Sequence, residues 1–501
     1  MEDSPREPQE RAPLAIGPIP TPGMLDIDLP RLAISPPEAR EQTRKVIRLS
    51  YAQAMFAAIY VASTGGMFMI GFARMLGQGN PDDALSDERM FVLIGLMSTF
   101  PMLCVLGQLL SSVMIERGVS RRGLTFFSAL INVLLWPSVI LIPFVSDHLG
   151  LSSEQKLYCL IALITGITFF GHLCANARAS WVGDLIPGRF RGPFFGKVAM
   201  FASIVATVFA IAEGRFLDYV KDHGLVAFSL LFVFGMIFGL ANALSFWPQR
   251  DIPIQRNDRV SFRKLLLATV KNKPLLATMG FMLVFMMQTV AGPFYVTYML
   301  DMDLGFFNIG VINSALALAM VLSSPFWGRV VQRVGCRPVL ILCVTILGLL
   351  QFAWIVVDKA WITFAVIMPC NAVAGLVIGG ISVAMNTLIY KVTPSTGRSV
   401  QLAIYTITVT LIAAPMPWLG GHLPPFLKGL GIDSADLRWT FYVAGIFCLL
   451  ASVAGRLIRE DNARSVTHLM RHLAGRLRYQ IRGLPIRVRY LLRHQRHRGT
   501  R

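Results

Sequence analysis

Charged residues are scarce in this sequence of 501 residues, where Asp, Glu, Lys and Arg together make up only 15%. Soluble globular proteins contain about 25% charged residues and about 45–50% apolar ones. Here the apolar share is 54%, and the mean hydropathy is +0.58. This composition excludes disorder over most of the chain and argues against a soluble multidomain enzyme. A polytopic membrane protein is the class that remains.

Motifs of catalysis and of metal binding are missing as well. None of the seven cysteines forms a C-x-x-C pair, so neither a zinc ribbon nor a redox dithiol is indicated. The chain contains no G-x-x-x-x-G-K-[ST], G-x-S-x-G or H-E-x-x-H motif. We therefore predict a protein that is not an enzyme, does not hydrolyse ATP to drive itself, and needs no cofactor or metal.

Long apolar runs occupy most of the chain. A helix needs roughly 20 apolar residues to cross the hydrocarbon core of a membrane. Transmembrane strands would instead give alternating segments of roughly ten residues. We predict an all-α membrane protein with twelve transmembrane helices, at residues 47–72, 89–115, 122–145, 157–180, 194–217, 224–246, 275–299, 304–328, 338–357, 360–389, 399–420 and 438–458.

Basic residues are distributed unevenly between the loops. The short loops on one side of the predicted membrane hold 18 Lys and Arg, and those on the other side hold eight. The positive-inside rule places the first side in the cytoplasm, together with both termini. The net charge of +19 then reflects membrane topology, so no nucleic acid partner is expected. We expect a monomer, integral to a cytoplasmic (inner) membrane, with the lipid bilayer as its surroundings.

Two loop motifs recur at nearly the same distance along the chain. Arg117 and Arg333, after the second and eighth helices, are 216 positions apart. Arg191 and Arg398, after the fourth and tenth helices, are 207 positions apart. Two motifs repeated at nearly one offset predict a duplicated six-helix unit, and hence two pseudo-symmetric bundles. The predicted units are a disordered, Pro-rich cytoplasmic leader at 1–44, bundles at 45–246 and 274–458, an inter-bundle loop at 247–273, and a tail at 459–501.

The loop motifs carry a resemblance to a family. Residues 328–337 match the G-x-x-x-D-R-x-G-R loop of the major facilitator superfamily, except that Gln332 replaces the acid. The first copy keeps the acid–Arg pair as Glu116-Arg117, and Ser112 replaces its leading Gly. With the placement of both loops and the helix count, the sequence resembles this superfamily over most of its length. The resemblance implies alternating access between two six-helix bundles, around a cavity lined mainly by helices 1, 4, 7 and 10.

The loop residues are also candidates for a gate. Arg side chains can pair with carboxylates or with the C-terminal carbonyls of helices, and the resemblance supports such a role. The alternative is plain anchoring by positive charge at the cytoplasmic surface. In either case these residues should not touch substrate. The gating candidates are Glu116, Arg117, Arg191, Arg333 and Arg337.

Ionisable residues are almost absent from the predicted spans. Glu213 lies near the outer end of the fifth helix, and Arg178 lies near the inner end of the fourth. Because an ionisable group in the membrane is costly, each is a functional hypothesis. Glu213 could couple transport to protons, or pair with Arg215 at the surface. Arg178 could contact an anionic substrate or Asp184, or extend to the interface.

Polar and aromatic residues on four helices are candidates for lining the cavity. His172 and Asn176 share one face of the fourth helix, because they are four residues apart. Such residues suit a neutral or weakly charged organic solute. The alternatives are interhelical hydrogen bonds and, for His172, a packed histidine. The other cavity candidates are Gln53, Tyr60, Thr64, Gln288, Tyr295 and Asn371.

Glycine patterns distinguish two further helices. Gly375-x-x-x-Gly379 predicts that another helix approaches the tenth helix closely. Between Lys197 and Arg215 the fifth helix has one glycine, Gly214, and no proline. It therefore lacks the G-x-x-x-G-P-x-x-G-G pattern of the drug/proton antiporters, which argues against that branch of the family.

The C-terminal tail is rich in arginine. Residues 460–501 contain eleven Arg, four His and no Lys, and apolar residues recur near helical spacing from Leu469 to Leu491. We predict a basic amphipathic helix that lies on anionic lipid. Docking to an acidic partner, contact with RNA and a solvated tail are the alternatives.

Taken together, these features predict a secondary transporter that moves a small organic solute by alternating access, with proton coupling as one means of driving it. Two alternatives stay open. One is an efflux permease for amphipathic compounds. The other is a non-transporting membrane sensor or scaffold that uses the permease fold.

Overall fold

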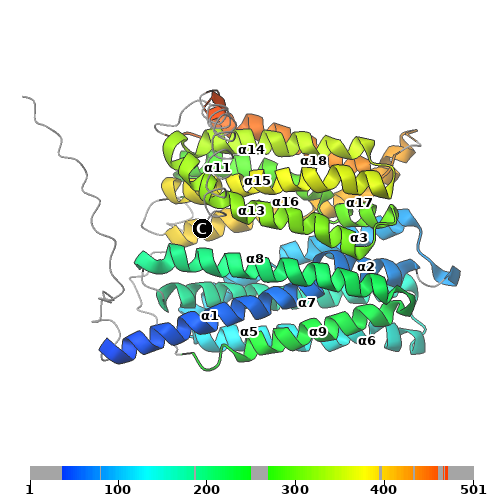
Figure 1. The fold of residues 1–501 in the computed structure, drawn as a ribbon, viewed down its shortest axis with the longest axis horizontal. Coiled ribbons are helices and arrows are strands. Elements are labelled where there is room, and N and C mark those ends of the chain that lie inside the picture. The colour runs from blue at the N-terminus through cyan, green and yellow to red at the C-terminus, as the bar shows by residue number, and fades with distance from the viewer. Residues whose placement is uncertain are drawn as a thin grey trace, which may run out of the picture.

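The structure is a computed structural model in which the described residues form helices and their connections (Figure 1). The described residues are 36–78, 81–185, 188–249, 269–393, 398–432 and 435–460, with 467 and 469–471 beyond them. Residues 1–35, most of the inter-bundle loop and most of the arginine-rich tail lie outside this set.

Twelve helical segments among the described residues are long and apolar enough to cross a membrane. Their bounds lie within a few residues of the predicted runs, except at the end of the eleventh, which extends to Gly429. The first half contains α1 (Pro36–Thr64), α2 (Gly66–Gln78), α3 (Asp87–Leu103), α4 (Leu106–Glu116), α5 (Arg121–Leu134), α6 (Trp136–His148), α7 (Ser153–Leu185), α8 (Gly188–Tyr219) and α9 (Leu225–Leu244). The second half contains α11 (Lys273–Met286), α12 (Phe294–Asp301), α13 (Phe306–Val334), α14 (Cys336–Gln351), α15 (Ala360–Val392), α16 (Arg398–Ala413), α17 (Met416–Gly429) and α18 (Arg438–Ala454).

Several membrane-crossing segments consist of two helices. Between α1 and α2 the chain turns at Gly66, whose φ of 54° is accessible to glycine without strain. Between α11 and α12 the chain forms a short 3₁₀ segment, Met287–Ala291, before Pro293. Proline has no backbone N–H to continue an α-helical ladder, so the break falls there.

Helix α1 begins earlier than the predicted leader boundary. The structure is helical from Pro36, whereas the sequence predicts disorder up to residue 44. Pro36 and Pro37 occupy the first turn, where the missing N–H has no intrahelical partner to lose. The residues that follow include Glu, Ala, Arg and Gln, which are good helix formers.

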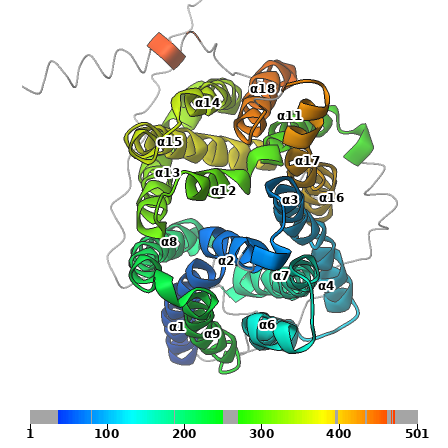
Figure 2. The same cartoon turned by 90° about the vertical axis from the view of Figure 1, so that its right-hand side faces the viewer.

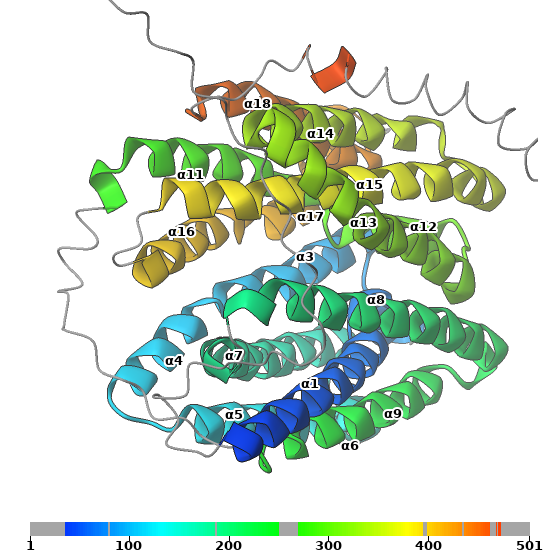
Figure 3. The ribbon, with the colours of Figure 1, turned by 60° about the vertical axis from the view of Figure 1, so that its left-hand side comes forward.

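The two halves form two layers of helices (Figure 3). We call one end of the molecule the closed end; it holds the connections 81–86, 149–152, 220–224, 302–305 and 352–359, with the described residues 430–432 and 435–437. The opposite end, called the tail end, holds the connections 117–120, 245–249 and 335. Viewed along the helices, α8 lies beside α13 and α3 lies beside α17 (Figure 2). These two pairs join the bundles.

The largest hydrophobic cluster crosses from one bundle to the other at the closed end. It contains the buried Phe68 and Phe232 from the first half, and Phe294 and Phe441 from the second. Burying a side chain of this size contributes roughly 1.5–3 kcal/mol. The smaller clusters found among the described residues each lie within one bundle. The bundles are therefore packed against each other at the closed end, and each has its own core near the tail end.

Two glycines set the distance between α13 and α15. A Cβ atom on Gly375 would lie 2.2 Å from the carbonyl oxygen of Leu316, and one on Gly379 would lie 2.3 Å from Ser323 Oγ. No side chain fits at either position without displacing its neighbour. The predicted close approach at Gly375-x-x-x-Gly379 is confirmed, and its partner is α13.

Candidate solute site and the contacts between the bundles

A cavity of about 320 Å³ lies inside the second bundle, between α11–α12, α13, α14 with the 3₁₀ turn that follows it, and α15. Three of the predicted cavity residues, Gln288, Tyr295 and Asn371, line it. None of the described residues that line the cavity is charged. The other lining residues are Phe285, Met299, Asn313, Leu316, Leu347, Leu350, Gln351, Trp354, Ile367, Cys370, Ala374 and Ile378.

One wall of the cavity is an aromatic cluster. The Tyr295 hydroxyl donates a hydrogen bond of 2.8 Å to Gln351 Oε1. Its ring stacks on Phe441, with centroids 4.7 Å apart and planes within 8°. Trp354 packs against both rings, with centroids 5.7 Å from Tyr295 and 4.7 Å from Phe441. Tyr295 is thus held in one orientation, and an amide and two aromatic faces border the cavity.

The first bundle contains a corresponding cluster. The Tyr60 hydroxyl donates to Asn132 Oδ1 at 2.7 Å and accepts a hydrogen bond from Trp136 Nε1. Trp136 also packs against Phe232, with ring centroids 5.3 Å apart. In each half a tyrosine of the first span bonds to an amide of the third span, and a tryptophan follows that amide by three or four residues. This recurrence supports the predicted duplication at the level of side chains.

The other predicted cavity residues of the first bundle bond to neighbouring helices. His172 Nδ1 lies 3.1 Å from Gln108 Nε2, and Asn176 Nδ2 donates to Gln108 O and to Ser112 Oγ. Both residues thus join α7 to α4, which is the interhelical alternative. They do not line the cavity of the second bundle, and a role in substrate binding stays a prediction for them.

The remaining candidates of the first span are buried. Gln53 Nε2 donates to the carbonyl of Ser245, 3.2 Å away at the end of α9. The Thr64 hydroxyl donates to Tyr60 O at 2.6 Å, one turn earlier in the same helix. Neither residue lines the cavity. Gln53 instead joins two spans of the first bundle.

The two intramembrane ionisable residues, Glu213 and Arg178, contact residues within the first bundle. Glu213 is buried, and one carboxyl oxygen is hydrogen-bonded to Ser63 of α1. Arg215 lies over the ring of Phe307, 5.7 Å from its centroid, and not beside Glu213. The interpretation of Glu213 and Arg215 as a surface pair is therefore wrong. Arg178 lies over the ring of Phe246, at 5.4 Å.

The gating candidates lie at the tail end. Glu116, Arg117 and Arg333 are exposed. The backbone N–H groups of Cys336 and Arg337 both donate to Glu460 Oε2 at 2.8 Å. The side chain of Arg191 lies outside the described part of the chain, and the latch role of the whole group stays a prediction.

Glu460 joins three segments of the second bundle. Besides capping the N-terminus of α14, its carboxylate forms an ion pair with Lys391 at the end of α15, where Lys391 Nζ lies 2.8 Å from Glu460 Oε1. Burial raises the pKa of this carboxyl, but the backbone N–H donors and the Lys391 ammonium outweigh burial and hold the pKa below its usual value. Two residues beyond the last span are buried in the same core, Ile458 and Leu469. The start of the tail therefore packs on the bundle.

Polar contacts between the bundles reinforce the closed end. Arg74 of α2 forms an ion pair with Asp301 and donates to Thr297 O at 3.1 Å. Lys428 of α17 lies 3.1 Å from Glu88 of α3. Exposed pairs of this kind contribute little individually, typically up to about 1 kcal/mol. Both pairs join the first bundle to the second at the closed end.

A third contact joins α8 to α13. The carboxylate of Asp218 accepts hydrogen bonds from the backbone N–H groups of Phe306 and Phe307, at 2.8 and 2.9 Å. These N–H groups begin α13 and have no partner within that helix. A carboxylate also suits the positive end of a helix dipole. Asp218 of one bundle therefore caps a helix of the other.

Helices α3 and α17 approach each other more closely than side chains allow. A Cβ atom on Gly95 would lie 2.5 Å from Pro417 O, and one on Gly421 would lie 2.4 Å from Phe91 O. In the same interface the N–H of Trp418 donates to the hydroxyl of Thr99 at 3.2 Å. No side chain fits at either glycine without displacing the backbone of the other bundle.

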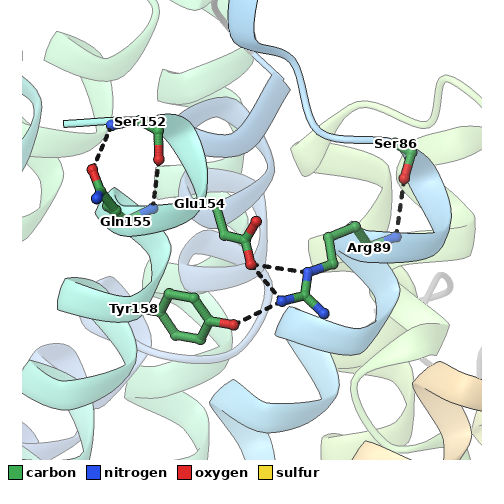
Figure 4. A network of polar contacts seen from close by, with 6 residues as sticks. All are labelled: Ser86, Arg89, Ser152, Glu154, Gln155 and Tyr158. Carbon is green, nitrogen blue, oxygen red and sulfur yellow. Dashed lines mark hydrogen bonds and ion pairs between the residues drawn. The ribbon is translucent and has the colours of Figure 1, made fainter. Parts of the chain in front are cut away.

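A polar network stiffens the rim of the first bundle at the closed end (Figure 4). Arg89 donates to Glu154 and, at 2.8 Å, to the hydroxyl of Tyr158, which ties α3 to α7. Ser152 and Gln155 form a reciprocal capping box at the start of α7. The network thus ties the start of α3 to the start of α7 at this rim.

Sequence reasoning missed five polar or aromatic residues of the cavity: Phe285, Asn313, Gln351, Trp354 and Cys370. A signal for Gln351 was present. Asn132 and Gln351 are lone amides in the apolar third and ninth spans, 219 positions apart, which is close to the repeat offset. Comparing polar residues at that offset would have paired them.

Comparison with known proteins agrees with this architecture. The sequence model of the Major Facilitator Superfamily matches residues 277–495. The quinolone resistance protein NorA of Staphylococcus aureus (strain MRSA252) is 22% identical over 175 residues, which is 35% of this chain. The match spans only 42% of the length of that relative.

Solved structures share the fold over nearly their whole length. The POT family transporter PepTSo superposes with a TM-score of 0.65 at 10% identity, covering 83% of this chain and 97% of that one. A D-xylose-proton symporter superposes with a TM-score of 0.61 at 13% identity, covering 85% and 99%. At such identities the likeness concerns the fold alone. The fold is that of an integral membrane protein with two six-helix bundles, and the second half of the chain is similar in sequence to the Major Facilitator Superfamily.

Proposed function

We propose that this protein is a secondary transporter that moves a small, uncharged organic solute across the membrane by alternating access. The observation that carries the proposal is the cavity of about 320 Å³ in the second bundle, which is lined by amide, aromatic and aliphatic side chains, none of them charged. Its volume is at the lower end of the range for small-molecule sites. A charged solute would lose its hydration there without gaining a counter-charge.

The amides define the chemistry that the cavity suits. Gln288, Asn313 and Asn371 each offer a donor and an acceptor, which suits hydroxyl, amide or heterocyclic groups. Trp354 and the ring of Tyr295 offer apolar faces for stacking. A compact solute with polar edges and one flat face fits both features.

The orientation, surroundings and driving force belong to the same proposal. The basic loops at the tail end support a cytoplasmic location for both termini and insertion in the inner membrane. The protein acts as a monomer, and the tail beyond Leu469 lies on anionic lipid. Glu213 is the coupling carboxylate, and the exposed loop residues Glu116 and Arg117 act in gating.

Thermal stabilisation of the purified protein tests the proposal. The probes are D-xylose, uridine, a dipeptide and a fluoroquinolone. A ligand that binds only the folded state raises stability by roughly 2.7 kcal/mol at a hundredfold excess over Kd. The stabilisation should disappear in Asn313→Leu, which alters the cavity. It should persist in Asn308→Leu, an exposed amide on the same helix that does not line the cavity.

The probes also separate the alternatives. Stabilisation by the fluoroquinolone alone would favour efflux of amphipathic compounds. The name of the NorA relative and the aromatic wall support that alternative. A sensor or scaffold predicts no stabilisation by any probe, no flux, and a phenotype from deleting residues 460–501 alone.

A further inference from the structure

Glu213 occupies a place in the fold where a proton has a structural effect. It lies on α8, which packs between α1 of its own bundle and α13 of the other bundle. One carboxyl oxygen is bonded to Ser63 of α1, and the other is buried without a hydrogen-bond partner. An unmatched buried carboxyl oxygen is unfavourable if the group is ionised. Glu213 must therefore either carry a proton or lie near a compensating positive charge.

The hydrogen bonds of Ser63 indicate that the carboxyl group of Glu213 carries a proton. Ser63 Oγ lies 2.9 Å from Ile59 O and also within hydrogen-bond distance of Glu213 Oε1. A serine hydroxyl has one proton to donate. If it donates to Ile59 O, the hydrogen between Ser63 and Glu213 must come from the carboxyl group. A protonated Glu213 that donates to Ser63 Oγ satisfies all three groups.

The alternative, an ionised Glu213, has no counter-charge. The charged residues of α1 all lie at or before Arg48, at least fifteen positions from Ser63, α9 has no charged residue, and the basic residues of α13 lie near the tail end. On α8 itself, Arg215 lies over an aromatic ring of α13, and Asp218 is bound to the N-terminus of α13. Arg74 of α2 pairs with an aspartate at the closed end. A buried carboxylate without a cationic partner costs several kcal/mol in such surroundings.

The same turns of α8 hold the closed end shut. Gly214 and Asp218 are four residues apart and share the face toward α13. A Cβ atom on Gly214 would lie 2.6 Å from the carbonyl oxygen of Phe306, whose N–H is capped by Asp218. Glu213, the neighbour of Gly214, faces α1 instead. Moving α8 away from α13 to open the closed end therefore also moves the carboxyl group relative to Ser63.

We infer that Glu213 is a proton-binding site, and that its protonated form stabilises the closed end through α8. This inference rests on the alternating-access function proposed above and assigns its pH control. Binding a proton more tightly in the closed state shifts the population toward that state as the pH falls. Deprotonation leaves a carboxylate that the closed site does not match, so the closed end opens.

The distance between the two rims measures this effect. Spin labels are placed at Leu149→Cys and Lys359→Cys, exposed positions at the closed end of the first and second bundle, in a background without the seven native cysteines. The distance distribution is recorded from pH 5 to pH 9 in lipid nanodiscs. We expect a short distance at low pH and a longer one at high pH. In Glu213→Gln, whose amide can donate to Ser63, the short distance should persist at every pH.

Two further variants keep the test specific. Ser63→Ala removes the acceptor, so the midpoint of the transition should move to lower pH. Glu154→Gln removes another carboxylate of the closed end, one that bonds to Arg89 and Tyr158 in its own bundle, and should leave the midpoint unchanged. A distance that does not change with pH, or that changes equally in Glu213→Gln, overturns the inference.

The outcome is separable from that of the proposed function. If no solute probe stabilises the protein and the distance still depends on Glu213, the transport proposal fails and the proton site stands. If a probe binds through Asn313 and Glu213→Gln behaves as the unmodified protein, the proton site fails and the transport proposal stands.

Discussion

Replacing Gly421 with alanine should open the closed end without unfolding either bundle. The new methyl carbon would lie 2.4 Å from the carbonyl oxygen of Phe91 on the other bundle. Ordinary contacts of this kind are roughly 1 Å longer, so α17 must move away from α3 by about that distance. Forcing one extra carbon into a tight contact costs about 1–3 kcal/mol. The cost arises only in the closed arrangement, where the two helices meet.

That free energy converts directly into populations. At 1.4 kcal/mol for each factor of ten, the ratio of closed to open molecules should fall roughly 5- to 150-fold. The distance between labels at Leu149→Cys and Lys359→Cys reports the two populations. Gly429→Ala is the matched control, because it adds the same methyl group on the same helix where nothing lies within 4 Å.

The reasoning is refuted if Gly421→Ala and Gly429→Ala give the same distance distribution while both proteins melt like the unmodified one. It is also refuted if Gly421→Ala lowers the melting temperature by unfolding a bundle with no longer distance appearing. Gly95→Ala repeats the perturbation from the other side of the interface, 2.5 Å from Pro417 O, and should act in the same direction.

Three further predictions concern the second bundle. Tyr295→Phe removes the hydroxyl that donates to Gln351 and should lower the free energy of unfolding by about 1–3 kcal/mol, measured by thermal melting. Adding Gln351→Leu should recover part of that loss, because no unpaired polar group then remains. Unchanged melting in Tyr295→Phe would contradict this. Glu460 has a lowered folded-state pKa, so its stabilisation is present above the ordinary carboxyl pKa of about 4.3 and is lost as the pH falls through the folded value. The melting-temperature advantage over Glu460→Gln should therefore be constant near neutral pH and shrink below about pH 4, and an advantage that grows on acidification would show the sign to be wrong. Gly375→Ala places a methyl carbon 2.2 Å from a main-chain oxygen of α13 and should destabilise by about 1–3 kcal/mol, whereas Gly280→Ala, with open space around it, should not.

The helices could be predicted from the sequence because lipid imposes length and apolarity on each segment separately. The predicted seventh run at 275–299 compares with 273–301 in the structure, although the break before Pro293 divides it into two helices. Local signals also sufficed where one residue determines the geometry. Gly375 is an example: a glycine leaves room for another helix whichever helix that is, so the close approach could be predicted without knowing that the neighbour is α13.

The site could be predicted only in part. Helical spacing tells which residues share a face of one helix, but not what lies opposite. It therefore named Tyr295 and Gln288, which line the cavity of the second bundle, but could not supply Gln351 from another span. His172 shows the same limit: its face was identified, yet its partner on α4 is 64 positions away. For Glu213 the sequence offered Arg215, two positions away, as one possible partner, whereas the hydrogen-bond partner in the structure is Ser63 of α1, 150 positions away.

Solute exchange in proteoliposomes tests the central claim most directly, that the uncharged cavity of the second bundle is the solute site of a transporter. The vesicles are loaded with the unlabelled probe that best stabilises the protein, among D-xylose, uridine, a dipeptide and a fluoroquinolone. Entry of the radiolabelled probe is then followed. We predict exchange with the unmodified protein and with Asn308→Leu, and at least a tenfold slower exchange at a subsaturating probe concentration with Asn313→Leu. Equal exchange in the two variants, or none in the unmodified protein, would contradict the account.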